Sequence, residues 1–506
     1  MKRLISPQDM RDGEARYFAS ANVPSIEVME RAAQALADVV SAEVPTGATL
    51  YFACGTGGNG GDGTACARLL RDQYNCRIFQ PRPPKSPDAI ENLRRAREKR
   101  IPVVECSEAT ALENPPCPDA WVDALFGTGL SRCPEGAERA LIGRVNRDRA
   151  RGARVYAADV PSGLNGATGR AYAACVQADH TVTFQYLKQG LVLADGLDCC
   201  GEIHVADVGF PETPFGESDA VLFEPSDISA CIPKRRRNLH KGDCGHLLIV
   251  AGSFGMAGAA AMCARGALRG GAGLVSLACP ESIVPILQVL APQAMCVPLP
   301  EQRGAICEAA LPALERALAG KSAVVVGPGL SRRACPEILR AALESGLPAV
   351  IDADGLNLLS ENRALRTLLN ERHVLTPHPG EAARLIGQEA LENPVAAARA
   401  LSALGATALY KGASSVIATP SDPCAYVSVS GGCGMARGGS GDILSGLLGA
   451  LLADRNRASS PCMTAACASE LHGLAGARAQ DKYGAHAMNA ADVLEFLPEV
   501  FKAHVD

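Results

Sequence analysis

The sequence predicts an α/β fold in two successive domains, and three observations carry this prediction. Short β-branched runs alternate with amphipathic stretches of about 10 to 15 residues through most of the chain, a pattern typical of βα units and parallel sheets. The chain has 506 residues, enough for two to four domains of about 150 residues each. The alternation fails over residues 212–243 and then restarts, so we expect one domain over residues 1–220 and another over residues 221–506.

The first domain begins with a helical run over residues 25–43. A second helix is expected at residues 63–72, directly after a turn rich in glycine. Strands are expected where short apolar, β-branched or aromatic runs end at polar or Gly-bearing turns, at residues 49–53, 76–80, 120–125 and 154–158.

Residues 212–243 are polar, charged and Pro-bearing, and we interpret them as the domain boundary. The basic run at 234–237 fits a solvated linker better than a guide for an anionic ligand. Beyond it, helices are expected at 258–269 and, long and apolar, after Gly441. Strands are expected at residues 246–251, 274–279, 323–327, 349–352 and 374–376, and shorter ones at 406–411, 415–419 and 425–430.

Composition excludes several classes of protein. The 49 Lys and Arg against 54 Asp and Glu give a net charge of −5, so the chain lacks the positive field on which nonspecific nucleic-acid binding depends. The start lacks the apolar run of a secretory signal, and no window has the roughly 20 apolar residues that span a bilayer. We therefore expect a cytoplasmic protein. The 20 cysteines are scattered without a CxxC pair, which favours reduced core residues over disulfides or structural zinc.

A Gly-rich segment over residues 55–63, GTGGNGGDG, follows the first expected strand and precedes a helix. Backbone N–H groups and the helix dipole at such a turn can hold a diphosphate or another anion. The glycines also match GxGxxG, but the second strand runs into Gln80 and Pro81 and lacks the acid that holds a ribose in a conventional NAD dehydrogenase. The alternative is a turn whose glycines serve close packing alone.

Two further strand ends carry polar groups beside glycines, in the segments DALFGTGL and DVPSGL. Ligands of parallel sheets sit outside the carboxyl ends of strands, so these loops and the Gly-rich segment can converge on one crevice. Asn59, Asp123 and Ser162 offer hard oxygen ligands, which suit a main-group cation better than zinc or copper. Taken alone, Asp123 can equally be a turn former.

The three segments, in this order and spacing, resemble the NAD(P)H-hydrate epimerase family. The resemblance implies a three-layer Rossmann-like fold that interconverts the R and S hydrates of NADH or NADPH, with K+ held by Asn59, Asp123 and Ser162. Asp159 is the candidate acid–base group, since epimerisation at a hydroxyl-bearing carbon needs proton transfer. Lys188 also fits the family pattern, whereas Gly58 stands where the family commonly has Asn. Contacts to the hydrate are implied for Gly58, Asn59, Gly60, Gly61, Asp62, Gly127, Thr128, Gly129, Leu130, Ser131, Arg132, Cys133 and Asp159.

A second candidate site lies at Gly438-Gly439-Ser440-Gly441-Asp442, before the apolar helix. Unpaired N–H groups there would point at one spot beside a carboxylate. In phosphoryl transfer such N–H groups stabilise the moving phosphoryl while the carboxylate takes the proton of the attacking hydroxyl. The alternative is that Asp442 only complements the helix dipole, which contributes less than about 1 kcal/mol.

Four more segments end predicted strands: GPGL at 327–330, DADGLN at 352–357, TPHPGE at 376–381 and KGASS at 411–415. Pro377 and Pro379 hold His378 in a stiff extended loop, which favours a ligand contact. Lys411 can meet a nucleotide phosphate as a point charge. The P-loop motif GxxxxGK[ST] is missing from the sequence, which argues against a P-loop ATPase.

With HKGDCGHLLIVAGS and GMAGAA, these segments resemble ADP-dependent NAD(P)H-hydrate dehydratases of the ribokinase-like superfamily, and the order of domains resembles the fused bacterial NAD(P)H-hydrate repair enzymes. The resemblance implies phosphate transfer from ADP to the hydroxyl of the S hydrate and then elimination, giving NAD(P)H, AMP and phosphate, with Mg2+ accompanying the nucleotide. GSGD replaces the usual GTGD and keeps the hydroxyl. Implied hydrate contacts are Ala259, Gly329, His378 and Asp442; implied ADP contacts are Lys411, Gly412, Ala413, Ser414, Ser415 and Gly441.

Two other hypotheses stay open at the level of sequence. A ribokinase-like small-molecule kinase fused to a nucleotide-sensing domain would also use GSGD and Lys411, and the first domain could be a nucleotide-binding or interaction module without activity. We expect NADH or NADPH hydrates and ADP as small-molecule substrates, no nucleic-acid or membrane partner, and a homo-oligomer, although the sequence does not show the oligomeric state.

Overall fold

A computed structural model describes the chain except residues 22, 107–115, 217, 458 and 506. The chain divides into two compact units, one over residues 3–219 and the other over residues 220–506 together with the first two residues. Both units contain parallel sheets with helices on their faces, so the predicted α/β class is confirmed. Among the described residues, no helix is long and apolar enough to cross a membrane.

The strands and helices of the first unit are mostly short. Its strands are β1 (Lys2–Ile5), β2 (Thr49–Cys54), β3 (Asn75–Gln80), β4 (Val103–Glu105), β5 (Ala120–Ala124), β6 (Arg154–Ala158), β7 (His180–Phe184), β8 (Leu187–Lys188) and β9 (Glu202–Ala206). Its helices are α1 (Pro7–Ser20), α2 (Ser25–Glu43), α3 (Gly58–Leu70), α4 (Pro87–Glu98), α5 (Gly136–Arg149) and α6 (Gly196–Cys199).

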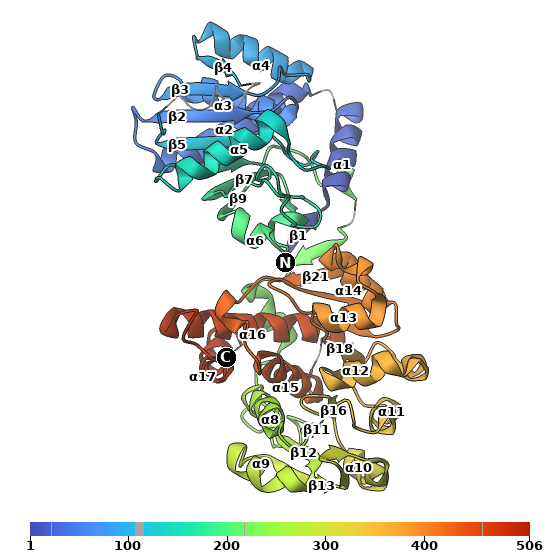
Figure 1. Ribbon diagram of the computed structural model, residues 1–506. Helices are drawn as coiled ribbons and strands as arrows, with labels where there is room; N and C mark the ends of the chain where they lie inside the picture. Colours follow the sequence, from blue (N-terminus) through green and yellow to red (C-terminus); the bar gives the residue numbers. More distant parts are fainter. Residues whose placement is uncertain (22, 107–115, 217, 458, 506) are drawn as a thin grey trace. The chain divides into compact units, whose positions relative to one another are not determined.

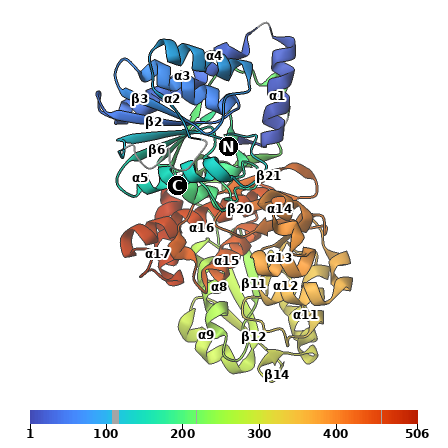
Figure 2. The same ribbon diagram turned by 45° about the horizontal axis from the view of Figure 1, so that its top comes forward.

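A seven-stranded parallel sheet in the order β4-β3-β2-β5-β6-β7-β9 forms the centre of this unit. Alternate residues of each strand face opposite sides, so the sheet needs cover on both faces. Side chains of α1 to α4 pack on one face, around Phe52 and Val182. Those of α5 pack on the other, around Trp121 and Val155. The result is a three-layer unit, visible at the blue end of the chain in Figures 1 and 2.

The second unit is built in the same way on a larger sheet. Its strands are β10 (Ala220–Leu222), β11 (His246–Val250), β12 (Leu274–Pro280), β13 (Met295–Leu299), β14 (Glu301–Gln302), β15 (Ala305–Ile306), β16 (Ala323–Val326), β17 (Ala349–Ile351), β18 (His373–Leu375), β19 (Thr407–Tyr410), β20 (Ser415–Thr419) and β21 (Asp422–Ser428). Its helices are α7 (Ile228–Cys231), α8 (Ala257–Arg269), α9 (Val284–Leu290), α10 (Leu311–Leu318), α11 (Pro336–Glu344), α12 (Asp354–Glu361), α13 (Pro379–Ile386), α14 (Pro394–Ser402), α15 (Ser440–Ala453), α16 (Pro461–Tyr483) and α17 (Ala490–His504).

The strands of this unit follow the order β13-β12-β11-β16-β17-β18-β19-β20-β21-β10. Pairing is parallel from β13 to β19 and antiparallel across β19, β20 and β21. Helices α8, α15, α16 and α17 bury their apolar sides against one face of the sheet. Helices α11 to α14 lie on the other side (Figure 1). Strand ends β16, β17, β18 and β19 therefore share one edge with the start of α15, which is where the second candidate site was expected.

The helix after the Gly-rich segment differs from the one expected from the sequence. Helix α3 begins at Gly58 and ends at Leu70, whereas a helix over 63–72 was expected. The low helix propensity of glycine favours a turn here, but close packing requires glycine within the helix. A Cβ on Gly60 would lie 2.0 Å from the Gly55 carbonyl oxygen, and one on Gly63 would lie 2.4 Å from Ala124 Cβ. The boundary region is also partly regular, since it holds β10, paired with β21, and α7. These elements are too short to produce visible periodicity.

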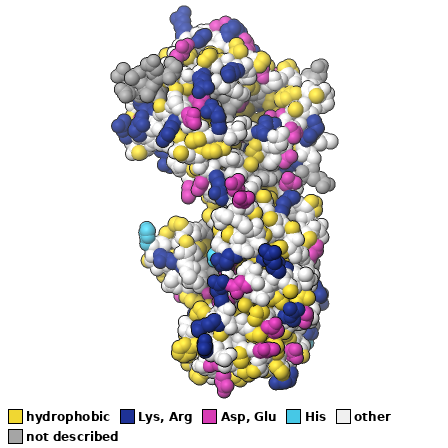
Figure 3. Space-filling model, turned by 45° about the vertical axis from the view of Figure 1, so that its right-hand side comes forward, with side chains coloured by type: hydrophobic (Ala, Val, Ile, Leu, Met, Phe, Trp, Pro, Cys, Tyr) yellow, Lys and Arg dark blue, Asp and Glu magenta, His cyan; other side chains and the backbone are white. Residues whose placement is uncertain are grey.

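All 20 cysteines are free, as expected for reduced core residues, and most of them are buried. On the face drawn in Figure 3, Lys and Arg are interspersed with Asp and Glu, as the charge balance of the sequence suggested.

Candidate functional site

The first candidate site lies where β2, β5 and β6 end. After Cys54 the chain turns through Gly55 and enters α3 at Gly58, so the N–H groups of the first turn of α3 point away from the sheet edge. A Cβ on Gly127, in the loop after β5, would lie 3.2 Å from Asp159 Oδ2 and 3.3 Å from Asn59 Cγ. Because Gly127 has no side chain, the start of α3 and the end of β6 can lie close together.

Asn59, Asp123 and Ser162 have the properties of ligands for a hard cation. Both polar atoms of the Asn59 side chain are buried without a hydrogen-bond partner. Asp123 is fully buried; its Oδ2 accepts from Ser162 N (2.7 Å) and its Oδ1 from Leu125 N (3.3 Å). Burial raises the pKa of Asp123 to about 6, although these hydrogen bonds lower it. A buried amide oxygen and carboxylate that lack a cationic partner fit K+.

Asp159 lies directly after β6 in the left-handed region, with φ of 64°. Such a conformation is costly outside glycine and often marks a functional position. The Lys188 ammonium, almost fully buried, contacts Asp159 Oδ1 at 2.7 Å, and Thr183 Oγ1 donates to the same oxygen at 3.2 Å. Lys188 also donates to the Phe184 carbonyl at 2.6 Å. Asp159 is thus held in a fixed position by a buried cation.

Two more carboxyl groups lie near Asp159. Burial, followed by the charge of Asp159, raises the pKa of Glu14 to about 7, against the lowering effects of Lys188 and Arg11. Burial together with Asp159 and Glu14 also raises the pKa of Asp62 well above its usual range. Glu14 comes from α1 and was not anticipated from the sequence. Its only sequence signal is an acidic residue in a helix before the first motif, which is too common to be informative.

The loop after β5 lines an open cavity of about 270 Å3. Thr128, Gly129, Leu130 and Ser131 form one wall, and the start of α1 with residues 165–167 and Tyr172 forms the rest. Arg11 donates to the Thr128 carbonyl at 2.7 Å and fixes the loop against α1. Of the other expected contacts in this loop, Arg132 pairs with Glu138 of α5 at 3.5 Å, and Cys133 Sγ lies 3.7 Å from the Pro134 carbonyl oxygen.

The second candidate site is organised by a buried ion pair. Lys411, at the end of β19, contacts Asp352 Oδ1 at 2.8 Å, and Ser445 of α15 donates to Asp352 Oδ2 at 2.6 Å. Burial opposes ionisation of Asp352, but Lys411 and the hydroxyls of Ser445 and Thr376 outweigh it and lower the pKa. A Cβ on Gly441 would lie 3.2 Å from Lys411 Nζ. The start of α15 therefore lies directly against Lys411.

Asp442 occupies the first turn of α15, whose cap residue Gly439 is left-handed with φ of 96°. Burial, followed by the charge of Asp352, raises the pKa of Asp442 to about 7; Lys411 lowers it, and Asp354 and Glu381 raise it further. Helix α15 is fixed against α8 by glycines, since a Cβ on Gly446 would lie 1.9 Å from the Cys263 carbonyl oxygen. A carboxyl group with this pKa exchanges its proton near neutral pH, as a general base must.

The remaining predicted contacts lie on the same edge of the sheet. Gly329 is left-handed, with φ of 60°, and a Cβ there would lie 2.9 Å from Ala259 Cβ, so these two positions adjoin. His378 caps α13: its Nδ1 accepts from Gly380 N at 3.0 Å, and its own N–H donates to Glu381 Oε2 at 2.9 Å. The turn after β19 places Gly412 and Ala413 at the surface, Ser415 half-buried and Ser414 buried.

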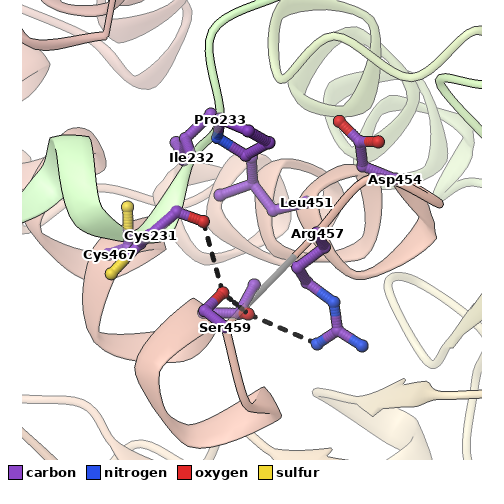
Figure 4. Close-up of a pocket in the computed structure, with 9 residues that line it drawn as sticks. Cys231, Ile232, Pro233, Leu451, Asp454, Arg457, Ser459 and Cys467 are labelled. Atoms are coloured by element: carbon purple, nitrogen blue, oxygen red, sulfur yellow. Dashed lines mark hydrogen bonds between the residues drawn. The ribbon is translucent and has the colours of Figure 1, made fainter.

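The sequence alone gives no role to Asp352, although the DADGLN segment at the end of β17 begins with this residue. Its importance depends on the pairing with Lys411, which follows it by 59 positions, and no local pattern reveals that. A separate small pocket in this unit, with room for about one water molecule, lies among α7, α15 and α16. There the thiols of Cys231 and Cys467 face each other (Figure 4), away from the residues above.

Comparison with known proteins matches the two parts of the chain to two different families. A family model described as NAD(P)H-hydrate dehydratase matches residues 247–499, and one described as YjeF-related protein N-terminus matches residues 25–190. A bifunctional NAD(P)H-hydrate repair enzyme from Moorella thermoacetica is 36% identical over 99% of this chain and 96% of its own length. The corresponding enzyme from Escherichia coli is 33% identical over 98% and 93%.

A solved structure shares the fold of the second unit. The ribokinase-like superfamily protein from Enterococcus faecalis covers 57% of this chain and 97% of its own, with a TM-score of 0.50 and 23% identity. The ribokinase-like fold expected for the second unit is therefore found.

Proposed function

This chain belongs to the family of bifunctional NAD(P)H-hydrate repair enzymes, and we propose that its two units divide the repair between them. The first unit interconverts the R and S hydrates of NADH and NADPH. The second unit dehydrates the S hydrate with ADP and returns NAD(P)H, AMP and phosphate. The observation that carries this division is that each unit has its own carboxylate at a glycine-bearing sheet edge, Asp159 in one and Asp442 in the other.

In the first unit we assign proton transfer to Asp159. Epimerisation at a carbon that bears a hydroxyl needs a proton to move while the ring opens or water leaves. Lys188 holds the Asp159 carboxylate in place at 2.7 Å. Glu14 is a second group that can exchange a proton near neutral pH, because its pKa is about 7. The first turn of α3, from Gly58 to Asp62, and the loop from Gly127 to Ser131 are proposed to bind the nucleotide.

K+ is proposed as the resident cation of the first unit. Asn59, Asp123 and Ser162 would hold it, since Asn59 has an unsatisfied buried side chain and Asp123 is a buried carboxylate. A cation held there would neutralise Asp123, whose Oδ2 accepts a hydrogen bond from the N–H of Ser162. Its chemistry is electrostatic, and the proton is moved by Asp159.

In the second unit we assign the general base to Asp442. It removes the proton of the hydrate hydroxyl, whose oxygen then bonds to the terminal phosphorus of ADP as AMP leaves. The N–H groups at the start of α15 stabilise the charge on the transferred phosphoryl, and Lys411 meets the nucleotide phosphates. Elimination then breaks the C–O bond to phosphate while the adjacent ring carbon loses a proton to solvent, which restores the double bond of the reduced nicotinamide. Phosphorylation is needed because hydroxide is a poor leaving group. Mg2+ bound with ADP would neutralise phosphate charge.

Other contacts of the second unit are proposed from position. Ala259, Gly329 and His378 line the edge where the hydrate would lie, and Gly441 adjoins Lys411 where the nucleotide would lie. The turn with Gly412, Ala413, Ser414 and Ser415 follows Lys411 directly.

The test is to incubate an R and S mixture with protein, ADP and Mg2+ and to follow both hydrates, the absorbance of reduced nicotinamide, and phosphate. We expect both hydrates to disappear with release of AMP and phosphate. Consumption of S alone would show that the first unit is not an epimerase. A stable phosphorylated alcohol without free phosphate would instead show a kinase.

The proposal also includes assembly into a homo-oligomer in the cytoplasm, where a soluble coenzyme is repaired. Light scattering checks the assembly, since one copy has a mass of 52.5 kDa. Cell fractionation checks the location.

A further inference from the structure

A cluster of two histidines and a glutamate lies at the amino ends of β7 and β9 in the first unit. His180 begins β7, and its register partner on β9 is Glu202. His204 follows Glu202 by two positions, and residues two apart on a strand face the same side of the sheet. One ligand atom from each of the three side chains lies within 4.8 Å of the others. Asp159 follows the carboxyl end of β6, so this cluster lies at the opposite edge of the sheet from the proposed epimerase site.

The distances match those of a metal site. His180 Nδ1 lies 3.2 Å from His204 Nε2; two nitrogens at tetrahedral positions around zinc, each 2.0–2.1 Å from the ion, lie about 3.3 Å apart. The Glu202 carboxylate lies 4.0 Å from His180 Nδ1 and 3.8 Å from His204 Nε2. Its side chain is 69% exposed and can rotate inward by the remaining distance of under about 1 Å.

Glu43, at the end of α2, sets the orientation of His180. Its Oε2 lies 2.9 Å from His180 Nε2, and Tyr156 donates its hydroxyl to the same oxygen at 3.1 Å. The His180 ring is stacked on Tyr156, with centroids 5.1 Å apart and an interplanar angle of 14°. Nε2 therefore carries the proton, and the lone pair of Nδ1 faces His204. A carboxylate on the far nitrogen of a histidine is the usual partner of a metal ligand.

We propose that His180, Glu202 and His204 bind one divalent transition-metal ion, with water or an external group at the remaining position. Two imidazoles and one carboxylate favour Zn2+, Co2+, Ni2+ or Cu2+ over K+, Mg2+ or Ca2+. Glu43 and Glu202 supply two negative charges to the site. Arg154, 4.0 Å from Glu43, supplies one opposing positive charge. His180 is buried while His204 and Glu202 reach solvent, so an ion can enter from outside.

A metal ion at this site would stabilise the edge strand of the sheet. β9 is the last strand of the seven, and it pairs only with β7 within that sheet. A bound ion would link β9 to β7 and, through His180 and Glu43, to α2. This role is independent of the proposed repair reaction.

The test uses the full chain after removal of metal by a chelator, titrated with Co2+ and then with Zn2+. We expect one tight Co2+ per chain, with the visible absorption of a tetrahedral nitrogen and oxygen site, displaced by Zn2+, and a rise in the unfolding midpoint on Zn2+ addition. His204→Gln and His204→Ala should weaken binding by at least about 100-fold, and Glu43→Gln by about tenfold, since loss of a group that only orients a ligand costs about 10- to 100-fold. His504→Ala, in the other unit, is the control.

Cysteines are the main competitor for the ion, and the spectrum separates them. Thiolate-to-cobalt absorption that persists in His204→Gln would overturn the proposal, as would failure of Co2+ and Zn2+ to bind at micromolar concentration. His204→Gln should retain R-to-S exchange and the circular dichroism of the parent. If it has lost its fold, Glu202→Gln, at an exposed position, must then show weakened binding, and unchanged binding would contradict the site.

Discussion

The two proposed sites place a carboxylate at similar points of two sheets but differ in its direct ionic partner. Asp159 is paired at 2.7 Å with the buried ammonium of Lys188. Asp442 lies among carboxylates, while the nearby ammonium of Lys411 pairs with Asp352. A cation fixes the first carboxylate, whereas like charges and burial raise the pKa of the second to about 7. The difference indicates that the same backbone arrangement can hold a proton-transferring carboxylate either in contact with a buried cation, as at Asp159, or beside a cation that pairs with another carboxylate, as at Asp442.

The sharpest test of this contrast is Asp442→Asn. Loss of a general base should lower ADP-dependent dehydration by about 10²- to 10⁴-fold, with R-to-S exchange retained. Asp159→Asn is the matched variant and should do the reverse. Separate assays of the two reactions on both variants provide the measurement. If either substitution abolishes both activities in a folded protein, the two units do not act separately.

The buried pair of the first unit is tested by Lys188→Met. Removing the ammonium leaves Asp159 unpaired, which should lower the free energy of unfolding by about 3–5 kcal/mol and slow R-to-S exchange. The double variant Lys188→Met with Asp159→Asn should recover much of the stability but no exchange activity. Denaturant unfolding of the single and double variants measures the coupling. A loss in the double variant equal to the sum of the losses in Lys188→Met and Asp159→Asn would show that the two side chains do not interact.

Glycines of the first turns of α3 differ in what surrounds them, and substitution should reveal it. Gly60→Ala would push a Cβ against the Gly55 carbonyl and should lower the free energy of unfolding by about 1–3 kcal/mol. Gly58 has open space around it, so Gly58→Asn should change stability by no more than about 0.5 kcal/mol. Thermal unfolding compares them. Equal effects would contradict the packing role assigned to Gly60.

The pH dependence of dehydration should follow Asp442. With a pKa of about 7, the carboxyl group is mostly protonated near pH 6 and mostly ionised near pH 8. A base works only in its ionised form, so kcat/KM should rise by roughly tenfold over this range. R-to-S exchange provides the comparison within the same chain. A flat profile for dehydration would contradict the assignment of Asp442.

The smallest effect expected is that of K+ on stability. Folding raises the pKa of Asp123 from 3.8 to about 6, so its contribution to stability is fully present below about pH 4 and is lost as pH rises through about 6. K+ binds only the ionised carboxylate and should raise the unfolding midpoint by about 2–5 °C near pH 7.5 but very little near pH 5. Asp123→Asn should remove the difference. An equal rise at both pH values would contradict a site at Asp123.

Most strands were predictable from sequence because each is a buried run that ends at a polar turn. β6 and α2 have the expected bounds, and β2, β11 and β17 differ by one residue at one end. The start of α3 was missed because close packing, which sequence does not show, overrides the low helix propensity of glycine. β7 and β9 were also missed; their histidines interrupt the apolar pattern that marked the other strands.

The chemistry of the sites was less predictable than their location. Asn59, Asp123 and Ser162 come from motifs that could be read locally, and the structure places Asp123 and Ser162 in direct contact. Glu14 and Asp352, in contrast, interact with Asp159 and Lys411, which lie far from them in the sequence. The contacts of Arg132 with Glu138 and of Cys133 with the Pro134 carbonyl could likewise not be foreseen, since a motif does not determine which way the loop residues after it turn.

The cap on helix α13 limits what the second unit can recognise. Because Nδ1 of His378 accepts from two backbone amides, a neutral ring carries its hydrogen on Nε2, which lies 3.5 Å from Glu381 Oε1. A ligand atom facing it must therefore bear a lone pair, as a hydroxyl, carboxamide or phosphate oxygen does. On the proposed hydrate contact, His378 would favour coenzyme analogues that offer an acceptor oxygen to Nε2 over analogues that offer a methyl group or an ammonium there.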